Sequence, residues 1–232
     1  MIRLAIDTAT MTQSVALERD GAVVAHRSVT RRTGHSTSLL RSLEGVLEDA
    51  EVGVSDVDVV LCGLGPGSFT GVRVGLSLAL GLCAGTGARL GGVSSFYALV
   101  PLVPPQTLCA VALDARKGEV YAGVWEAAPS WTARIEPQTF DPTTFFETLD
   151  EHPERERIVL IGDGARAYAQ AFSPFEGRIR VIEALHTPHA AQLFSAADHG
   201  LVRWRDEGIL EPLYIRPSDA ELNPKFSPRQ AP

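Results

Sequence analysis

Residues 57–84 read VDVVLCGLGPGSFTGVRVGLSLALGLCA, and this stretch decides the fold class. The apolar run Val57–Cys62 is typical of a buried strand, and the glycine-rich turn Gly63–Ser68 follows it. Apolar spacing then predicts a helix over about Phe69–Ala84. A strand, a tight turn and a helix in this order indicate an α/β domain.

The expected helix carries two rows of small residues. One row consists of Gly71, Gly75 and Ala79, and the other of Ser77, Gly81 and Gly85. A glycine inside a helix costs up to about 1 kcal/mol relative to alanine. So many glycines are tolerable only where another element packs closely against the helix backbone. Because few residues of this helix are polar, we expect it to be covered on most sides.

The chain before this stretch predicts three strands and a helix. Ile2–Ile6 is a short apolar run that ends at Asp7, and Asp20-Gly21 between two apolar runs is a strong hairpin signal. Over Ser36–Ala50 the apolar period changes to that of a helix. The resulting apolar stripe contains Leu39, Leu43, Val46, Leu47 and Ala50.

The second half repeats this organisation, which predicts two related α/β lobes with a cleft between them. Leu108–Leu113 ends at Asp114 as the first strand ends at Asp7, and Val120–Trp125 returns after a turn. Further along, we expect a strand at Ile158–Ile161, a helix near Arg166–Phe172, a strand at Arg178–Ile182 and a helix over Pro188–Arg205. The expected division is an N-terminal lobe 1–103, with the helix at about 189–205 packing back on it, a C-terminal lobe 104–188, and a C-terminal segment 206–232 with a flexible tail.

Composition excludes several classes of protein. The 232 residues are 45% hydrophobic and carry a net charge of −7, so the chain can form a core but lacks the positive charge of a stand-alone nucleic-acid binder. Three widely spaced cysteines suggest neither a zinc site nor a disulfide framework. An acid at position 7 argues against a signal peptide, and the apolar run Val74–Leu90 is short for a membrane span. These features predict a soluble cytoplasmic protein.

The predicted cleft offers candidate nucleotide-binding residues. Acids at strand ends are common in functional crevices, but Asp7 and Asp114 could equally cap their own turns. The Gly63–Gly71 turn could hold an anion on free backbone N–H groups or be purely structural. It lacks the lysine of a phosphate-binding loop, and Gly67-Ser68-Phe69 does not fit the serine-hydrolase motif. The candidate cleft residues are Asp7, Thr8, Gly65, Gly67, Ser68, Asp114 and Gly162.

Four motifs, in order along nearly the whole chain, resemble the TsaB (YeaZ) family. They are LAIDTAT at 4–10, GPGSFTGVRVG at 65–75, LDARKGEVY at 113–121 and EPLYIR at 211–216. The resemblance implies a two-lobed actin-like, Hsp70-like ATPase fold (ASKHA). It also implies a non-catalytic subunit that binds and activates the enzyme TsaD, together with the ATPase TsaE, in making threonylcarbamoyladenosine beside the anticodon of tRNA.

The resemblance further implies pairing through the first two helices of the N-terminal lobe. A TsaD heterodimer is expected there, or a homodimer when TsaD is absent, with neither strong direct tRNA binding nor a membrane. No cofactor is required, although ATP or ADP at or near the interface fits the family. The expected interface residues are His35, Leu39, Ser42, Leu43, Val46, Leu47, Phe69, Val72, Arg73 and Leu76.

Two enzyme hypotheses compete with this interpretation. One is a nucleotide-hydrolysing enzyme of the actin-like class that uses Asp7 and Asp114. The other, a metallopeptidase, is weakened because catalytic relatives carry a His-x-x-x-His metal pair at the first helix. Here His35 is followed four residues later by Leu39, so we expect no metal site.

Overall fold

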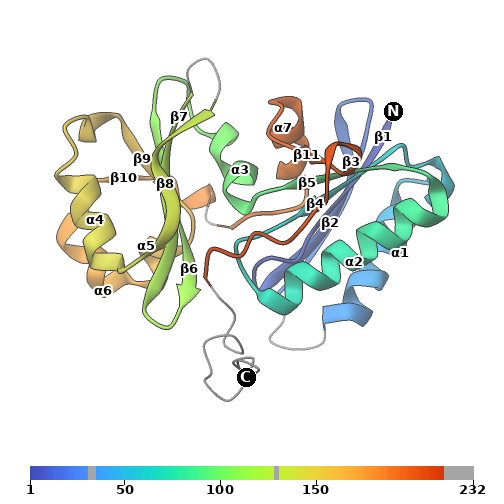
Figure 1. Cartoon of the computed structure of the whole chain (residues 1–232), viewed down its shortest axis with the longest axis horizontal. Helices are drawn as coiled ribbons and strands as arrows, with labels where there is room; N and C mark the ends of the chain where they lie inside the picture. Colours follow the sequence, from blue (N-terminus) through green and yellow to red (C-terminus); the bar gives the residue numbers. More distant parts are fainter. Residues whose placement is uncertain (31–34, 128–130, 186, 217–232) are drawn as a thin grey trace, which may run out of the picture.

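Two sheets, each with helices on it, form the two lobes of the molecule (Figure 1). A computed structural model describes residues 1–30, 35–127, 131–185 and 187–216, without the side chains of 35–37 and 127. The first sheet has the order β11-β5-β4-β1-β2-β3. Its strands are β1 Ile2–Asp7, β2 Thr12–Arg19, β3 Ala22–Thr30, β4 Val59–Gly63, β5 Arg89–Val93 and β11 Arg203–Trp204. β4 and β5 run parallel to β1, whereas β2, β3 and β11 pair antiparallel with their neighbours.

The central strand β1 of the first sheet is buried on both faces, because its side chains alternate between two cores. Leu4 and Ile6 pack in one core with α1 (His35–Asp49) and α2 (Phe69–Thr86). Ala5 points to the other, with α3 (Ser95–Leu99) and α7 (Gln192–Asp198). The predicted strand and helix of residues 57–84 are confirmed as β4 and α2, and the predicted hairpin turns at Asp20-Gly21, where both residues have positive φ.

The second sheet has the order β10-β9-β6-β7-β8. Its strands are β6 Leu108–Arg116, β7 Glu119–Ala127, β8 Trp131–Phe140, β9 Ile158–Ile161 and β10 Arg180–Val181. The helices on one face are α4 Pro142–Asp150, α5 Gly164–Ala167 and α6 Ala169–Phe172, with phenylalanines filling the core beneath them. Short 3₁₀ turns lie at Val54–Asp56, Val100–Leu102, Arg155–Arg157, Ser173–Phe175, Glu183–Leu185 and Arg205–Glu207.

The lobes meet at α3, which packs between the two sheets. Phe96 and Leu99 of α3 belong to the core on the inner face of the second sheet, and the Phe96 ring centre lies 5.0 Å from that of Trp125. Ala98 of the same helix packs with the core of the first sheet. One short helix therefore serves two cores and fixes the sheets relative to each other.

The helix predicted over Pro188–Arg205 is wrong in extent, since α7 covers only Gln192–Asp198 and β11 follows it. Gly200 turns the chain with a φ of +72°, and the next residues pair antiparallel with β5. A side chain at Gly91 would come within 2.7 Å of Val202. The absence of a side chain at Gly91 therefore leaves room for Val202 beside β5. The apolar residues Leu201 and Trp204, which suggested a longer helix, pack beside α7 instead.

Two further predicted elements are shorter than expected. The helix near Arg166–Phe172 is split into α5 and α6, and the strand Arg178–Ile182 is reduced to β10. β8 and α4 were not predicted from the sequence. β8 alternates between exposed and half-buried positions, which is a weak hydrophobic signal.

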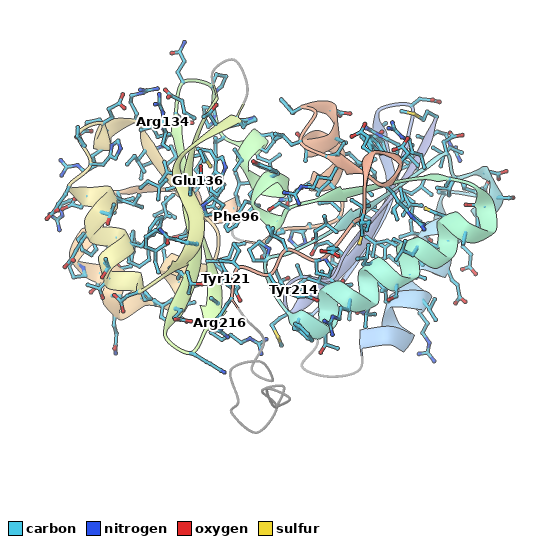
Figure 2. All side chains as sticks on the ribbon, viewed as in Figure 1. Phe96, Tyr121, Arg134, Glu136, Tyr214 and Arg216 are labelled. Atoms are coloured by element: carbon cyan, nitrogen blue, oxygen red, sulfur yellow. The ribbon has the colours of Figure 1, made fainter. Side chains whose placement is uncertain are left out.

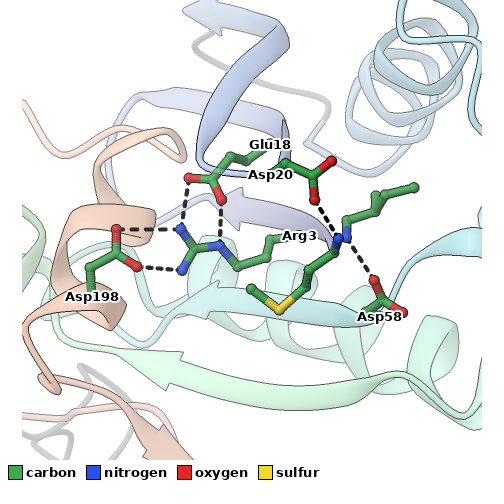
Figure 3. A network of polar contacts seen from close by, with 7 residues as sticks. Arg3, Glu18, Asp20, Asp58 and Asp198 are labelled. Atoms are coloured by element: carbon green, nitrogen blue, oxygen red, sulfur yellow. Dashed lines mark hydrogen bonds and ion pairs between the residues drawn. The ribbon is translucent and has the colours of Figure 1, made fainter.

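Buried Arg3 forms ion pairs both within the first sheet and with α7 (Figure 3). Arg3 of β1 donates from Nε and Nη2 to the two carboxylate oxygens of Glu18 on β2, at 2.6 and 2.7 Å. Its Nη1 donates to Asp198, at the end of α7, at 2.6 Å. Because Arg3 and Glu18 are both buried, each charge depends on the other for its stabilisation.

The helix α2 is long and apolar enough to cross a membrane by length and composition alone. In the fold it lies on the first sheet, with Val72, Leu76, Ala79 and Cys83 buried. A helix packed on a core passes the same test, so this feature carries no membrane assignment.

The C-terminal segment 206–232 is described only as far as Arg216. We call residues 210–216 the strap, because they run from the first lobe to the second (Figure 1). The N–H of Leu213 donates to the carbonyl of Leu64 at 2.7 Å, and Arg216 forms a 2.6 Å ion pair with Glu119 of β7. The predicted flexible tail, residues 217–232, lies outside the described residues.

Candidate functional site

A cleft of about 430 Å³ lies between the two lobes. Its walls are the turn after β1, the N-terminal end of α2, the end of β6 and the strap. Figure 2 shows Tyr214 beside the start of α2, with Tyr121 and Arg216 on the side of the second lobe. Of the predicted cleft residues, Gly67, Ser68 and Asp114 line this space, and Asp7, Thr8, Gly65 and Gly162 do not.

Asp114 is positioned by its own turn. Its Oδ1 accepts the N–H of Arg116 at 2.7 Å and the hydroxyl of Tyr168 at 2.8 Å. Burial, followed by the bond to Asp114, raises the pKa of Tyr168 to about 12. Asp163 accepts the N–H of Asp114 at 2.8 Å, and burial raises the pKa of its carboxyl. Asp114 therefore caps its own turn and also lines the cleft, while its role in binding a nucleotide stays a prediction.

Asp7 is fully buried and does not reach the cleft. Its Oδ1 accepts the N–H of Ala9 at 3.1 Å, whereas its Oδ2 has no hydrogen-bond partner. A side chain at Gly63 would overlap this carboxyl, so β4 covers Asp7 directly. Burial raises the pKa of Asp7 to about 6. The structure favours the turn-capping interpretation over a role in binding a nucleotide.

The substitution Asp7→Asn should stabilise the fold at neutral pH. In the unfolded chain the carboxyl ionises near its ordinary pKa of 3.8, and in the folded chain at about 6. Burial of Asp7 therefore costs no stability below about pH 4, where the carboxyl is neutral in both states. As the pH rises through 6, the free energy of unfolding falls, because the folded state must then hold a buried charge. At pH 7.5 we expect a gain on the order of 2 kcal/mol in the free energy of unfolding, which vanishes at pH 4.

Urea unfolding of both proteins between pH 4 and 8 measures this difference. Glu176→Gln, which removes an exposed carboxyl, is the control and should show no such pH-dependent gain. An Asp7→Asn gain that is equal at pH 4 and pH 7.5 would contradict the buried, ionisable carboxyl.

The glycine-rich turn before α2 is shaped by close packing. A side chain at Gly67 would overlap the carbonyl of Ala9, and the N–H of Ser68 donates to that carbonyl at 2.6 Å. The N–H of Gly71 donates to the Ser68 hydroxyl at 3.1 Å. Because protein acceptors occupy these two N–H groups, the structural interpretation of the turn is favoured over an anion site here.

The other two predicted glycines are also explained by packing. Gly65 has a φ of +84°, and a side chain there would lie 3.6 Å from the carbonyl of Leu213 in the strap. Gly162 has a φ of +97°, and a side chain there would overlap the carbonyl of Ala112.

Most of the predicted interface residues face the core. Leu39, Leu43 and Val46 of α1 pack against the chain's own sheet. Ser42, Val72 and Leu76 are also buried, and Leu47 is half-buried. This corrects the expectation that the stripe is open to a partner, because the apolar period of α1 marks the side that covers the sheet. The side chain of His35 lies outside the described residues.

Phe69 and Arg73 are the predicted interface residues that remain exposed. They border an apolar groove of about 500 Å³ between α1 and α2. The groove is lined by Leu39, Leu40, Phe69, Thr70, Arg73, Val74, Ser77 and Leu78. Leu40 is 48% exposed. Exposed Leu40 and Ser77 and half-buried Val74 and Leu78, which also line the groove, were not among the predicted interface residues.

The two small-residue rows of α2 have different surroundings. At Gly71 and Gly75 a side chain would overlap Thr8, so the first row accepts the turn after β1. At Gly81 and Gly85 a side chain would meet nothing within 4 Å. Ser77 of the same row is exposed. Contact with Thr8 therefore explains the glycines of the first row. No contact within the described chain explains Gly81 and Gly85 of the second row.

The strap ends beside the exposed start of α2. Tyr214 accepts a 2.7 Å hydrogen bond from Nε of Arg73, and its ring centre lies 5.2 Å from that of Phe69. An irregular segment has no hydrophobic period, so this contact could not be predicted from the sequence. Only the resemblance of residues 211–216 to a family motif singled the segment out.

Metal-ligating residues do not gather in the part of the chain that the structure describes. No group of three or more His, Cys, Asp or Glu side chains is placed to hold an ion there. Leu39, four residues after His35, is buried in the apolar core.

Solved structures define the class of this protein. A Pseudomonas aeruginosa structure described as an uncharacterized protein with similarity to peptidase YeaZ matches with a TM-score of 0.74, at 26% identity over 93% of this chain and 99% of that one. YeaZ from Pseudomonas aeruginosa matches with a TM-score of 0.71, at 25% identity over 92% and 99%. The chain is a two-lobed α/β protein with the fold of YeaZ.

Sequence comparisons specify the family. Residues 22–201 match the family model described as TsaD, tRNA N6-adenosine threonylcarbamoyltransferase. The tRNA threonylcarbamoyladenosine biosynthesis protein TsaB of Haemophilus influenzae is 30% identical over 92% of each chain. TsaB of Escherichia coli is 40% identical, in an alignment that covers about half of each protein. The chain belongs to the TsaB (YeaZ) family.

Proposed function

We propose that this chain is a non-catalytic subunit that binds TsaD and supports threonylcarbamoyl transfer to the adenosine beside the anticodon of tRNA. Its TsaB relatives are named for threonylcarbamoyladenosine biosynthesis. The proposal places the chain in the same synthesis, in the cytoplasm, together with TsaD and the ATPase TsaE.

The open row of small residues on α2 is the observation that carries the proposal. Gly81 and Gly85 lie in a helix where alanine would be more stable by up to about 1 kcal/mol each. No other part of the described chain uses the space above them. A partner helix that packs closely on this row accounts for the glycines, and the adjoining apolar groove supplies area to bury.

The interlobe cleft supports a non-catalytic role. Asp7 is sealed from the cleft, and the N–H groups of Ser68 and Gly71 are bonded to protein acceptors. The strap contributes Leu213–Arg216 to the wall of the same space. A nucleotide in this cleft would lie in contact with the strap. We therefore expect that ATP or ADP, if the complex uses one, binds at or near the partner interface.

The net charge of −7 is consistent with an indirect role in tRNA modification. Counterion release from tRNA requires clustered positive charge, which a TsaD partner would have to supply. The chain would then act by holding the enzyme that contacts tRNA.

One observation favours a second candidate, a nucleotide-hydrolysing enzyme. The carboxylates of Asp114 and Asp163 both line the cleft. This candidate predicts ATP hydrolysis by the chain alone, and loss of tRNA modification when Asp114 is replaced even though the complex with TsaD persists.

Complex formation with TsaD from the same organism distinguishes these proposals. We expect Ser77→Arg, a bulky charge at the N-terminal end of the open row and in the adjoining groove, to reduce both TsaD binding and threonylcarbamoyladenosine formation by about tenfold or more. Val46 is unsuitable for this test, because a charge there would disrupt the core. Size-exclusion chromatography and a modification assay with TsaE, tRNA, ATP and the threonylcarbamoyl donor measure the two effects.

The matched control is Gln170→Arg, which adds the same side chain at an exposed position of α6 on the other lobe. It should bind TsaD as the unchanged protein does. If Ser77→Arg binds normally, or if Asp114→Ala alone stops modification within an intact complex, the scaffold proposal is wrong.

A further inference from the structure

An exposed cluster of Phe69, Arg73 and Tyr214 stands at the start of α2. The guanidinium carbon of Arg73 lies 3.7 Å from the ring centre of Phe69 and 5.6 Å from that of Tyr214. The two rings are themselves 5.2 Å apart. Phe69 is 38% exposed and Tyr214 is 46% exposed. Two large aromatic side chains thus position an arginine at the surface. Their exposed apolar area has a free-energy cost, because it stays in contact with water.

Arg73 is held in place and yet has no carboxylate partner among the described residues. Its Nε donates to the Tyr214 hydroxyl, which leaves the two terminal nitrogens of the guanidinium for another acceptor. Other well-positioned arginines of the chain, such as Arg3 and Arg157, are bonded to carboxylates. A planar guanidinium fixed in advance suits bidentate binding of a carboxylate, because less side-chain entropy remains to be lost on binding.

The cluster is continuous with the apolar groove between α1 and α2. Phe69 and Arg73 line the groove, and Phe69, Tyr214 and the rest of the strap's end line the interlobe cleft. Arginine and aromatic residues dominate the binding energy of many protein interfaces. An amphipathic helix that laid apolar side chains in the groove would bring residues one turn away close to Arg73.

We infer that Arg73, held by stacking on Phe69 and by its hydrogen bond to Tyr214, receives a carboxylate from an amphipathic helix of the partner whose apolar side chains occupy the groove. The inference rests on the proposed function, since the partner is TsaD. It adds the strap to the docking surface, because Tyr214 positions the guanidinium. It also predicts that the partner residue that contacts Arg73 is an aspartate or a glutamate.

Binding of TsaD to variants of this cluster tests the inference. We expect Arg73→Gln to weaken binding about tenfold or more at 50 mM salt, and Arg73→Lys to weaken it less, because lysine keeps the charge but loses the planar fork. Raising the salt to 300 mM should weaken the unchanged protein clearly and Arg73→Gln only slightly, because a charge pair is screened. Dissociation constants by biolayer interferometry provide the measurement.

Variants of Tyr214 distinguish the positioning of the Arg73 side chain from the effect of its charge. Tyr214→Phe keeps the ring but loses the hydroxyl, and we expect a loss of a few-fold, whereas Tyr214→Ala should approach the loss of Arg73→Gln. Arg203→Gln, which removes an exposed arginine of β11 that has no carboxylate partner among the described residues, should bind as the unchanged protein does. Thermal unfolding of each variant confirms that the fold persists.

Each remaining outcome overturns a distinct claim. Normal, salt-sensitive binding by Arg73→Gln refutes the carboxylate receptor and leaves the proposed function intact. If the unchanged protein does not bind TsaD, the proposed function fails and this inference with it. If the substitutions impair only self-association, as measured by sedimentation of the chain alone, the groove accepts a second copy and the stated partner is wrong.

Discussion

Alanine at Gly71 is expected to destabilise the fold by about 3 kcal/mol or more, whereas alanine at Gly81 should stabilise it by up to about 1 kcal/mol. Both glycines belong to α2. At Gly71 the new methyl group would overlap the carbonyl of Thr8, which is backbone and cannot rotate away. At Gly81 the methyl group would meet nothing within 4 Å.

Gly75 gives an intermediate case that sharpens the prediction. A side chain there would overlap the hydroxyl of Thr8, which can rotate, but rotation would break its 2.7 Å bond to the carbonyl of Gly71. We therefore expect Gly75→Ala to destabilise the fold by less than Gly71→Ala. Urea unfolding followed by circular dichroism ranks the three variants. Equal stabilities of Gly71→Ala and Gly81→Ala would contradict the close approach of β1 to α2.

The same contrast explains what the sequence could predict about α2. Its position, its boundaries and both small-residue rows were evident from the period of the residues, and the structure confirms the helix. The period could not show which row meets the turn after β1, because that contact joins residues more than sixty positions apart. The functional meaning of a glycine row thus depends on tertiary packing.

The stripe of α1 shows a related limit. Leu39, Leu43 and Val46 were correctly recognised as one apolar face of a helix. A helix that covers a sheet and a helix that binds a partner both have such a face, so the pattern alone could not distinguish them. The surface that the structure leaves exposed lies beside this stripe, at Leu40 and along α2.

The cleft was predicted from the repeated strand-Asp-strand pattern, and its lining is only partly as expected. Asp114 lines the space and Asp7 does not, although Asp7 ends β1 and Asp114 lies near the end of β6. The difference arises because β4 covers Asp7 at Gly63. The strap, which lines the cleft and joins both lobes, has no periodic signal from which it could be predicted.

Removal of the charge of Glu18 is expected to cost about 3 kcal/mol of the free energy of unfolding. Arg3 and Glu18 face each other on paired strands, and their side chains are only 9% and 5% exposed. Glu18→Gln would leave a buried guanidinium facing a neutral amide, with the carboxylate of Asp198 as its remaining counter-charge (Figure 3).

Asp198→Asn should cost less than about 1 kcal/mol, although its distance to Arg3 is equally short. The Asp198 side chain is 56% exposed, so water and salt screen its charge. Unfolding in urea at 0.1 M and 1 M NaCl measures both costs. Urea is used because guanidinium chloride is a salt and would itself screen the charges. Salt should reduce the penalty of Asp198→Asn and leave most of that of Glu18→Gln.

The double variant Arg3→Met with Glu18→Leu completes the test. Replacing a buried ion pair by apolar side chains of similar size is often neutral or stabilising, because the cost of desolvating two charges disappears. We expect the double variant to recover most of the stability lost in Glu18→Gln, while α7 loses its bond from Asp198 to β1. A double variant less stable than Glu18→Gln would show that the ion pair, and not only the absence of an unpaired charge, stabilises the first lobe.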